Sequence, residues 1–247
     1  QRAVAIASLL AEVRRASYSS GLIFDDPVSP LDHIWRHKVA KRLVGEGEKR
    51  QVIIFTHDIV FLLAIEKECT EQRVPIFCDT LRDSSKGTGV SSNNDVPWAA
   101  KQVGKRVDHL YFCCSNAEKK YNSKEMDEYK TLARDCYDLL RQCWERAIEE
   151  VLFNRVVERF DPEVNTLSLK EVSIDDNDYL IIDRAMSKCS EILHDTSPAV
   201  NKPVPTPEEL RLDIQSLNNF VQMVKGRRQE IKKKRNEELG PPAAEIC

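Results

Sequence analysis

Long apolar runs are absent from this sequence of 247 residues. No stretch approaches the ~20 apolar residues that a membrane span needs, and the first residues lack the layout of a signal peptide. Strong net charge is also absent: the formal value is -3 at pH 7, which argues against attraction of nucleic acid over the whole surface. We therefore predict a cytoplasmic protein without membrane contact, in which any nucleic acid is bound by a local basic patch.

Two groups of functional motifs are missing as well. None of the eight cysteines forms the Cys-x-x-Cys pair of a zinc knuckle or redox site, so we expect reduced and mostly buried thiols. The eight glycines include no Gly-x-x-x-x-Gly-Lys-Ser/Thr phosphate loop. Without the amides and lysine of such a loop, this chain alone is not expected to bind ATP tightly or to hydrolyse it.

Polar, titratable residues are present at the ends of two predicted strands. Three apolar residues lead into Asp25 and Asp26, and Pro27 then stops the strand. A second apolar run ends at His57. Because the carboxyl ends of parallel strands meet at one edge of a sheet, we expect Asp25, Asp26 and His57 to lie along the same edge.

The stretches 25–33 and 50–58 resemble known ATPase motifs. Their residues, Asp-Asp-Pro-Val-Ser-Pro-Leu-Asp-His and Arg-Gln-Val-Ile-Ile-Phe-Thr-His-Asp, are similar to the Walker B, D-loop and H-loop of ABC-type P-loop ATPases, which include SMC-like and RecF-like proteins. Within that group they look closest to the bacterial PrrC- and RloC-like anticodon nucleases. The resemblance covers roughly residues 1 to 65.

The resemblance implies a role for each strand-end residue. Asp25 would bind Mg²⁺, a hard ion that needs only one or two protein oxygens beside the phosphates of ATP. Asp26 would polarise the attacking water, and His57 would reach the γ-phosphate or that water. Ser29 and Asp32 would contact the nucleotide as part of the D-loop. Most of the wider group has Glu at the position of Asp26, and the alternative interpretation is a solvated strand end with turn residues.

The same resemblance implies missing partners. In the similar ATPases a Ser-Gly-rich signature turn precedes the first helix and binds the γ-phosphate held by the opposite protomer. Neither this turn nor the phosphate loop is in the sequence. We therefore expect the C-terminal portion of a longer protein, which binds ATP and Mg²⁺ together with its N-terminal part and forms a homodimer around the nucleotide.

The order of predicted elements indicates an α/β fold followed by helices. Helices are expected at 1–13, 30–46 and 58–71, and strands at 22–26, 51–56 and 74–81. Residues 1–81 are thus predicted to be the C-terminal half of an ABC-type ATPase head with a mostly parallel sheet. Residues 82–97 are expected to be a flexible linker, 98–205 a mainly helical output module, and 206–247 an amphipathic basic helix with a tail.

Three regular elements are predicted within the output module. A long helix is expected from about 124 to 159, a short strand at 165–172, and a second helix at about 175–193. Thr206 is expected to cap the C-terminal helix, with Pro207 at its first position.

The output module also contains a candidate ribonuclease site. By resemblance to the anticodon nucleases, Arg141 and Glu145 would form the Arg-x-x-x-Glu pair and His194 the later histidine. Arg and Glu at i, i+4 share a helix face, which a histidine of the following helix could approach. His194 would transfer a proton to or from a ribose hydroxyl or the leaving oxygen, while Glu145 assists and Arg141 stabilises phosphate charge. The alternative is an ordinary surface ion pair and a helix cap.

Seven cations gather in the eleven residues from 225 to 235. They are either a solvated helix end that suits the helix dipole or a surface that binds nucleic-acid phosphates. Taken together, the sequence predicts part of an ABC/SMC-type ATPase that couples ATP binding and hydrolysis to a nucleic-acid-directed output, in bacterial anti-phage defence or repair. The alternative is a non-catalytic interaction subunit that keeps the ATPase fold.

Overall fold

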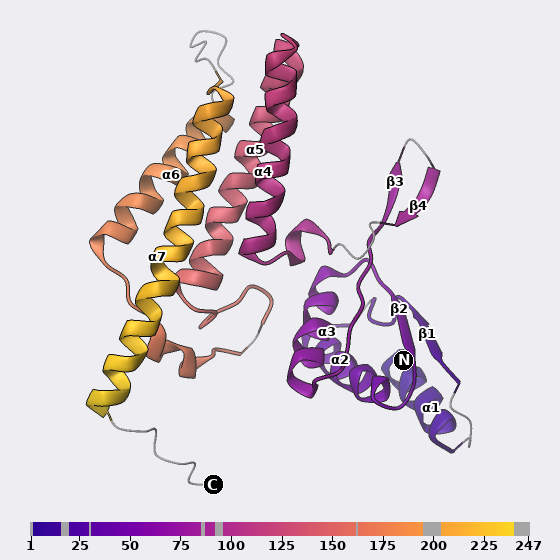
Figure 1. Ribbon diagram of the computed structural model, residues 1–247. Helices are drawn as coiled ribbons and strands as arrows, with labels where there is room; N and C mark the ends of the chain where they lie inside the picture. Colours follow the sequence, from indigo (N-terminus) through magenta and orange to yellow (C-terminus); the bar gives the residue numbers. More distant parts are fainter. Residues whose placement is uncertain are drawn as a thin grey trace. The chain divides into compact units, whose positions relative to one another are not determined.

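The computed structural model describes residues 2–15, 20–29, 31–84, 87–91, 96–161, 163–194 and 204–239. The chain divides into two compact units, unit 1 with residues 1–101 and unit 2 with residues 102–247. Figure 1 labels their helices and strands.

Unit 1 combines three α-helices with two pairs of short strands (Figure 1). Its elements are α1 (Arg2–Arg15), β1 (Leu22–Asp25), α2 (His33–Gly47), β2 (Val52–Phe55), α3 (Ile59–Gln72), β3 (Leu81–Ser84), β4 (Gly87–Ser91) and the 3-10 helix η1 (Trp98–Ala100).

The strands β1 and β2 form a parallel pair linked by α2. Their register pairs Leu22 with Val52 and Asp25 with Phe55. Side chains alternate along β1, so Leu22 and Phe24 are buried whereas Ile23 is 67% exposed. The buried face contributes to one core with α1, α2 and α3, which comprises Leu10, Val13, Leu22, Phe24, Val28, Val39, Ala40, Leu43, Val44, Phe61, Ala64, Ile65 and Cys69. The opposite face of the pair is exposed.

Aspartates fix the beginnings of α2 and α3. The carboxylate of Asp32 accepts a hydrogen bond from the backbone N–H of Trp35 at 3.0 Å. The carboxylate of Asp58 accepts from the N–H groups of Val60 and Phe61 at 3.0 and 3.1 Å. These bonds satisfy amides that have no partner inside the helix. The predicted helices at 30–46 and 58–71 and the predicted strands at 22–26 and 51–56 are confirmed within a few residues.

The predicted fold class is wrong. The protein is mainly helical, and its described strands form only two separate two-stranded sheets, β1-β2 and β3-β4, instead of the mostly parallel sheet of an α/β ATPase head. Extended propensity and strand-helix alternation are local properties of the sequence. A larger sheet requires further strands that pair with β1 or β2, and no described segment supplies them.

The predicted third strand at 74–81 illustrates this error. Residues 74–80 pair with no other strand, and only Leu81 belongs to a strand, β3. β3 instead pairs antiparallel with β4 inside the stretch predicted as a linker. Pro75 has no N–H to donate to a sheet, which agrees with the absence of pairing at this point.

Unit 2 is built from four long helices, shown in Figure 1. They are α4 (Val103–Asn122), α5 (Met126–Ala147), α6 (Asp176–His194) and α7 (Pro207–Leu239). α5 packs against the other three. Its buried residues recur at spacings of three and four, as expected for the central helix of a bundle: Tyr129, Ala133, Cys136, Tyr137, Leu140, Cys143, Trp144 and Ala147.

The long helix predicted from 124 to 159 ends earlier. α5 stops at Ala147 and continues as one π-helical segment, η2 (Ile148–Leu152). Asn154 and Arg155 then have positive φ values of 49° and 55°, which turns the chain out of the helix. The guanidinium of Arg228 on α7 donates to the carbonyl groups of Glu150 and Val151. This tertiary contact satisfies carbonyls of the η2 segment, and the local apolar periodicity does not reveal it.

The short strand predicted at 165–172 is also wrong. Its residues form a 3-10 helix, η3 (Thr166–Glu171), and side chains of Asn154 and Arg235 donate to the carbonyls of Ser168 and Leu169. The predicted helix at 175–193 and the helix that starts after Thr206 are confirmed as α6 and α7. The hydroxyl of Thr206 accepts from the N–H of Glu209 at 3.3 Å.

Candidate functional site

Parallel pairing brings the two predicted strand ends together in unit 1. The backbone N–H of Asp26 donates to the carbonyl of Phe55 at 2.8 Å, directly beyond the last pair of the register. Asp26 has a φ of 44°, an uncommon conformation for a residue other than glycine. Such conformations cost free energy and persist only where the surrounding structure holds them in place. They are found frequently at functional sites.

The side chains of Asp26 and His57 lie close to each other at this edge. The Oδ2 atom of Asp26 is 3.6 Å from the Nδ1 atom of His57. The histidine side chain is 82% exposed, whereas that of Asp26 is only 24% exposed. At this separation the two atoms are neighbours at the strand edge without a direct hydrogen bond between them.

Asp25 is the most accessible carboxylate at the edge. Its side chain is exposed and forms no ion pair or hydrogen bond with a described residue. Within the described ranges no group of three His, Cys, Asp or Glu side chains could hold a metal ion by itself. Asp25 can therefore bind Mg²⁺ only if the phosphates of a nucleotide supply further ligands to the ion.

The two predicted D-loop residues have different surroundings. Ser29 is half-buried in the turn after β1. Asp32 caps α2, so one of its oxygens is engaged by the N–H of Trp35. Asp58, which follows His57, caps α3 and also pairs with Arg36 at 3.1 Å. The position of His57 is thus set by a strand on one side and a capped helix on the other.

Of the three candidate nuclease residues, Arg141 and Glu145 have described side chains, whereas only the backbone of His194 lies within the described part of the chain. Arg141 and Glu145 face each other on α5, with Nε and Oε1 3.8 Å apart, and Glu145 also pairs with Arg159 at 3.1 Å. α6 runs antiparallel to α5: Trp144 near the end of α5 and Ile181 near the start of α6 line one pocket, and the earlier residue Tyr137 lines it together with the later residue Lys188. His194 lies at the other end of α6, about 20 Å further along the axis at about 1.5 Å per residue. This arrangement separates His194 from Glu145.

Most cations of the basic run contact the protein itself. Arg227 pairs with Asp175 and Asp178, each at 2.6 Å, and Arg228 donates to the carbonyls of η2. The remaining contacts link Lys232 with Glu171 at 2.7 Å, Arg235 with the carbonyl of Leu169 at 2.8 Å, and Lys234 with Glu238 at 3.8 Å. The run therefore holds α7 against the α5–α6 connection, which leaves fewer cations for nucleic acid than the sequence indicates.

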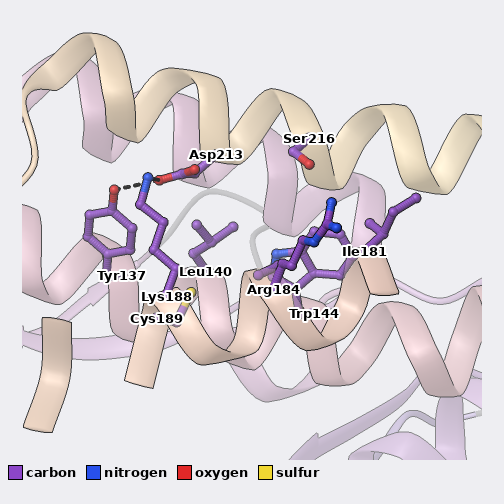
Figure 2. Close-up of a pocket in the computed structure, with 10 residues that line it drawn as sticks. Tyr137, Leu140, Trp144, Ile181, Arg184, Lys188, Cys189, Asp213 and Ser216 are labelled. Atoms are coloured by element: carbon purple, nitrogen blue, oxygen red, sulfur yellow. Dashed lines mark hydrogen bonds and ion pairs between the residues drawn. The ribbon is translucent and has the colours of Figure 1, made fainter. Parts of the chain in front are cut away.

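A pocket that the sequence does not predict lies between α5, α6 and α7 (Figure 2). Its volume is about 250 Å³, and it is lined by Tyr137, Leu140, Trp144, Ile181, Arg184, Ala185, Lys188, Cys189, Asp213 and Ser216. The residues come from three separate helices, so no sequence spacing identifies them as a group. The only local signal is that Arg184 and Lys188, at i, i+4, share one face of α6.

A hydrogen-bonded network closes one end of this pocket. The Oδ2 atom of Asp213 accepts from the hydroxyl of Tyr137 at 2.6 Å and lies 2.7 Å from the Nζ of Lys188 (Figure 2). Burial, followed by the hydrogen bond to Asp213, raises the pKa of Tyr137. Burial alone lowers the pKa of Lys188, but Asp213 and Glu209 outweigh this effect and raise it. Both groups therefore keep their protons at neutral pH.

The described cysteines are free thiols, as predicted. Burial raises the pKa of Cys143 and of Cys189 to about 12, so neither is a reactive thiolate at neutral pH.

Comparisons of the chain with models of known families, with curated proteins and with solved structures gave no match. Among the helices of the described residues, none combines the length and the apolarity required to cross a membrane.

Proposed function

We propose that Asp25, Asp26 and His57 contribute to a site that hydrolyses ATP with Mg²⁺ in the cytoplasm. The observation that supports this function best is the edge of the parallel β1-β2 pair, where the Asp26 carboxylate is 3.6 Å from His57 and Asp25 is exposed beside it. The proposal concerns this local β-α-β arrangement and does not require the large sheet of an ATPase head.

Each side chain has a distinct task in the proposed site. The Asp25 carboxylate would share Mg²⁺ with the phosphates, and the ion would neutralise charge that develops on them. Asp26 would orient and polarise the attacking water. His57, whose Nδ1 lies 3.6 Å from Asp26, would reach the γ-phosphate or that water. The exposure of His57 is in keeping with a ligand on that side.

The proposed site needs a second polypeptide segment. No phosphate loop or Ser-Gly signature is present in the sequence, so the amides that hold the phosphates would come from elsewhere in the intact protein or from a second copy. The nucleic-acid-directed output in bacterial defence or repair rests on the motif resemblance alone. A ribonuclease output is not part of the proposal because the backbones of His194 and Glu145 lie at different levels of the bundle.

A non-catalytic interaction function is the second candidate, and one specific observation favours it. The outer face of the β1-β2 pair exposes Ile23, Ile53 and Phe55, of which Ile23 is 67% exposed. Exposed apolar side chains in one group are typical of surfaces that contact another polypeptide. The two candidates differ in whether Asp26 and His57 affect ATP turnover.

The test is steady-state ATP hydrolysis by the intact protein that contains the phosphate-binding segment. Asp26→Ala and His57→Ala should each lower turnover by about 10²-fold or more while ATP still binds. Asp183→Ala, which removes an exposed carboxylate of unit 2, is the matched control and should leave turnover unchanged. Normal turnover in both edge variants would rule out the proposed site and favour the interaction function.

A further inference from the structure

The charges in the pocket between α5, α6 and α7 are not balanced. Asp213 and Lys188 neutralise each other at 2.7 Å, and Lys188 is also 3.4 Å from Glu209, which lies outside the pocket lining. Arg184 lines the same pocket, and its guanidinium has no ion pair or hydrogen bond with a described residue. The exposed side chain of Arg184 therefore brings a positive charge to the pocket that no carboxylate of the described residues pairs with.

The walls of the pocket contain apolar side chains and one hydroxyl. Ile181 and Ala185 provide accessible apolar surface beside Arg184, whereas Leu140 and Trp144 also line the pocket but are each only 1% exposed (Figure 2). Ser216 on α7 adds a hydroxyl that can donate or accept a hydrogen bond. A volume of about 250 Å³ is below the range usual for drug-sized ligands, so the occupant must be small.

The lining residues do not suit a metal ion or a catalytic reaction. Two cations in the pocket disfavour a metal ion. Cys189 is buried with its pKa raised to about 12, and the pKa of Tyr137 is raised by burial and by Asp213, so neither is an activated nucleophile or base. A guanidinium presents a planar fork that matches a carboxylate, and one uncompensated positive charge matches a singly charged anion better than a phosphate dianion.

We propose that this pocket binds a small monocarboxylate, whose anionic group pairs with Arg184 and whose apolar body contacts Ile181 and Ala185 next to the buried ring of Trp144. The side chains of Tyr137, Lys188 and Asp213 shape the opposite end and hold α6 against α5 and α7. This binding site is independent of the strand edge in unit 1 and of the ATPase proposal.

The experiment is a titration of the ¹⁵N-labelled full chain with benzoate, followed by NMR at the indole N–H of Trp144. Benzoate should shift this signal in a saturable manner, and benzamide, its neutral counterpart, should bind at least about tenfold more weakly. Arg184→Gln should weaken benzoate binding about tenfold or more. Arg134→Gln is the matched control, because Arg134 is an exposed arginine of α5 outside the pocket.

A second variant tests the pocket itself. Ala185→Phe places a ring in the cavity and should abolish the benzoate shift at Trp144, with the unfolding temperature measured alongside to verify folding. The proposal is overturned if benzoate does not shift the Trp144 signal, if benzamide binds equally well, or if Arg184→Gln and Arg134→Gln bind benzoate with the same affinity.

Discussion

Among the described residues, each unit has one carboxylate that is 0% exposed, and the two are neutralised differently. Glu46 of unit 1 is 0% exposed and is surrounded by Arg14, Arg42 and Arg50 at 3.1, 2.9 and 3.8 Å. Asp178 of unit 2 is also 0% exposed, but its only cation among the described residues is Arg227 at 2.6 Å. A buried charge is costly without a partner, so unit 1 has redundancy at this point and unit 2 has none.

The units also differ in the protonation states that their cores require. Unit 2 buries the thiols of Cys143 and Cys189 and the phenol of Tyr137. In unit 1 the described core contains one buried thiol, Cys69, whose pKa is raised by burial and by neighbouring glutamates. The stability of unit 2 should therefore depend more strongly on alkaline pH than that of unit 1.

The largest expected effect is loss of unit 2 stability between pH 9 and 12. Below the usual thiol pKa of 9.0, Cys143 and Cys189 are protonated in both states, and their contribution is fully present. Above it the unfolded chain loses these protons while the folded state retains them up to about 12. The free energy of unfolding should fall by about 1.4 kcal/mol per pH unit for each thiol in this window.

Urea unfolding followed by tryptophan fluorescence can resolve this effect. Trp144 reports unit 2 when Trp35 and Trp98 are replaced by Phe, and the reverse replacement reports unit 1. A Cys143→Ala, Cys189→Ala variant should be less stable at pH 7 and should lose the part of the dependence between pH 9 and 12 that comes from these two thiols. The rest should remain, because burial also raises the pKa values of Cys114, Tyr129 and Tyr137, and a hydrogen bond together with burial raises the pKa of Cys136. Equal losses of the free energy of unfolding in the two units between pH 9 and 12 would contradict the predicted difference.

The second-largest effect is the loss of stability when an arginine beside a buried carboxylate is removed. Arg227→Ala should destabilise unit 2 by about 3 to 5 kcal/mol, because Asp178 then stays buried without a cation. Arg14→Ala should cost less than about 1 kcal/mol, since Arg14 is half-exposed and two further arginines contact Glu46.

Urea unfolding of the double variant Arg14→Ala, Arg42→Ala tests the redundancy. The loss in the double variant should exceed the sum of the two single losses, because the last partner of Glu46 must then compensate the charge alone. Equal effects of Arg227→Ala and Arg14→Ala would show that the number of partners does not control stability here.

The smallest effect is the loss of stability when a helix cap is removed. Asp58→Ala should destabilise unit 1 by about 1 to 2 kcal/mol, since Asp58 accepts from two amides and pairs with Arg36. Thr206→Ala should cost unit 2 about 0.5 to 1 kcal/mol, because Thr206 accepts one bond at 3.3 Å. Unfolding in urea provides both values, and Asp58→Asn, which keeps the cap, should recover most of the loss. A larger loss for Thr206→Ala would reverse the ranking.

Part of the candidate site in unit 1 could be predicted from local pattern. Apolar runs that end in Asp25 and in His57 predict two strand ends, and parallel pairing follows from the helix between them. The distance of 3.6 Å between Asp26 and His57 depends on the register, which pairs Asp25 with Phe55. The turn residues Asp32 and Asp58 were recognisable as polar residues before helices, but only the structure shows that both act as caps.

The sequence by itself determined the helices, the two parallel strands and several caps, because these depend on residues within a few positions of one another. Tertiary structure decided the size of the sheet, since strands need partners that propensity does not supply. It also decided the use of Arg227 and Arg228, whose partners lie far away in sequence. The pocket beside Arg184 exists for the same reason: its lining comes from three helices that meet only in the folded bundle.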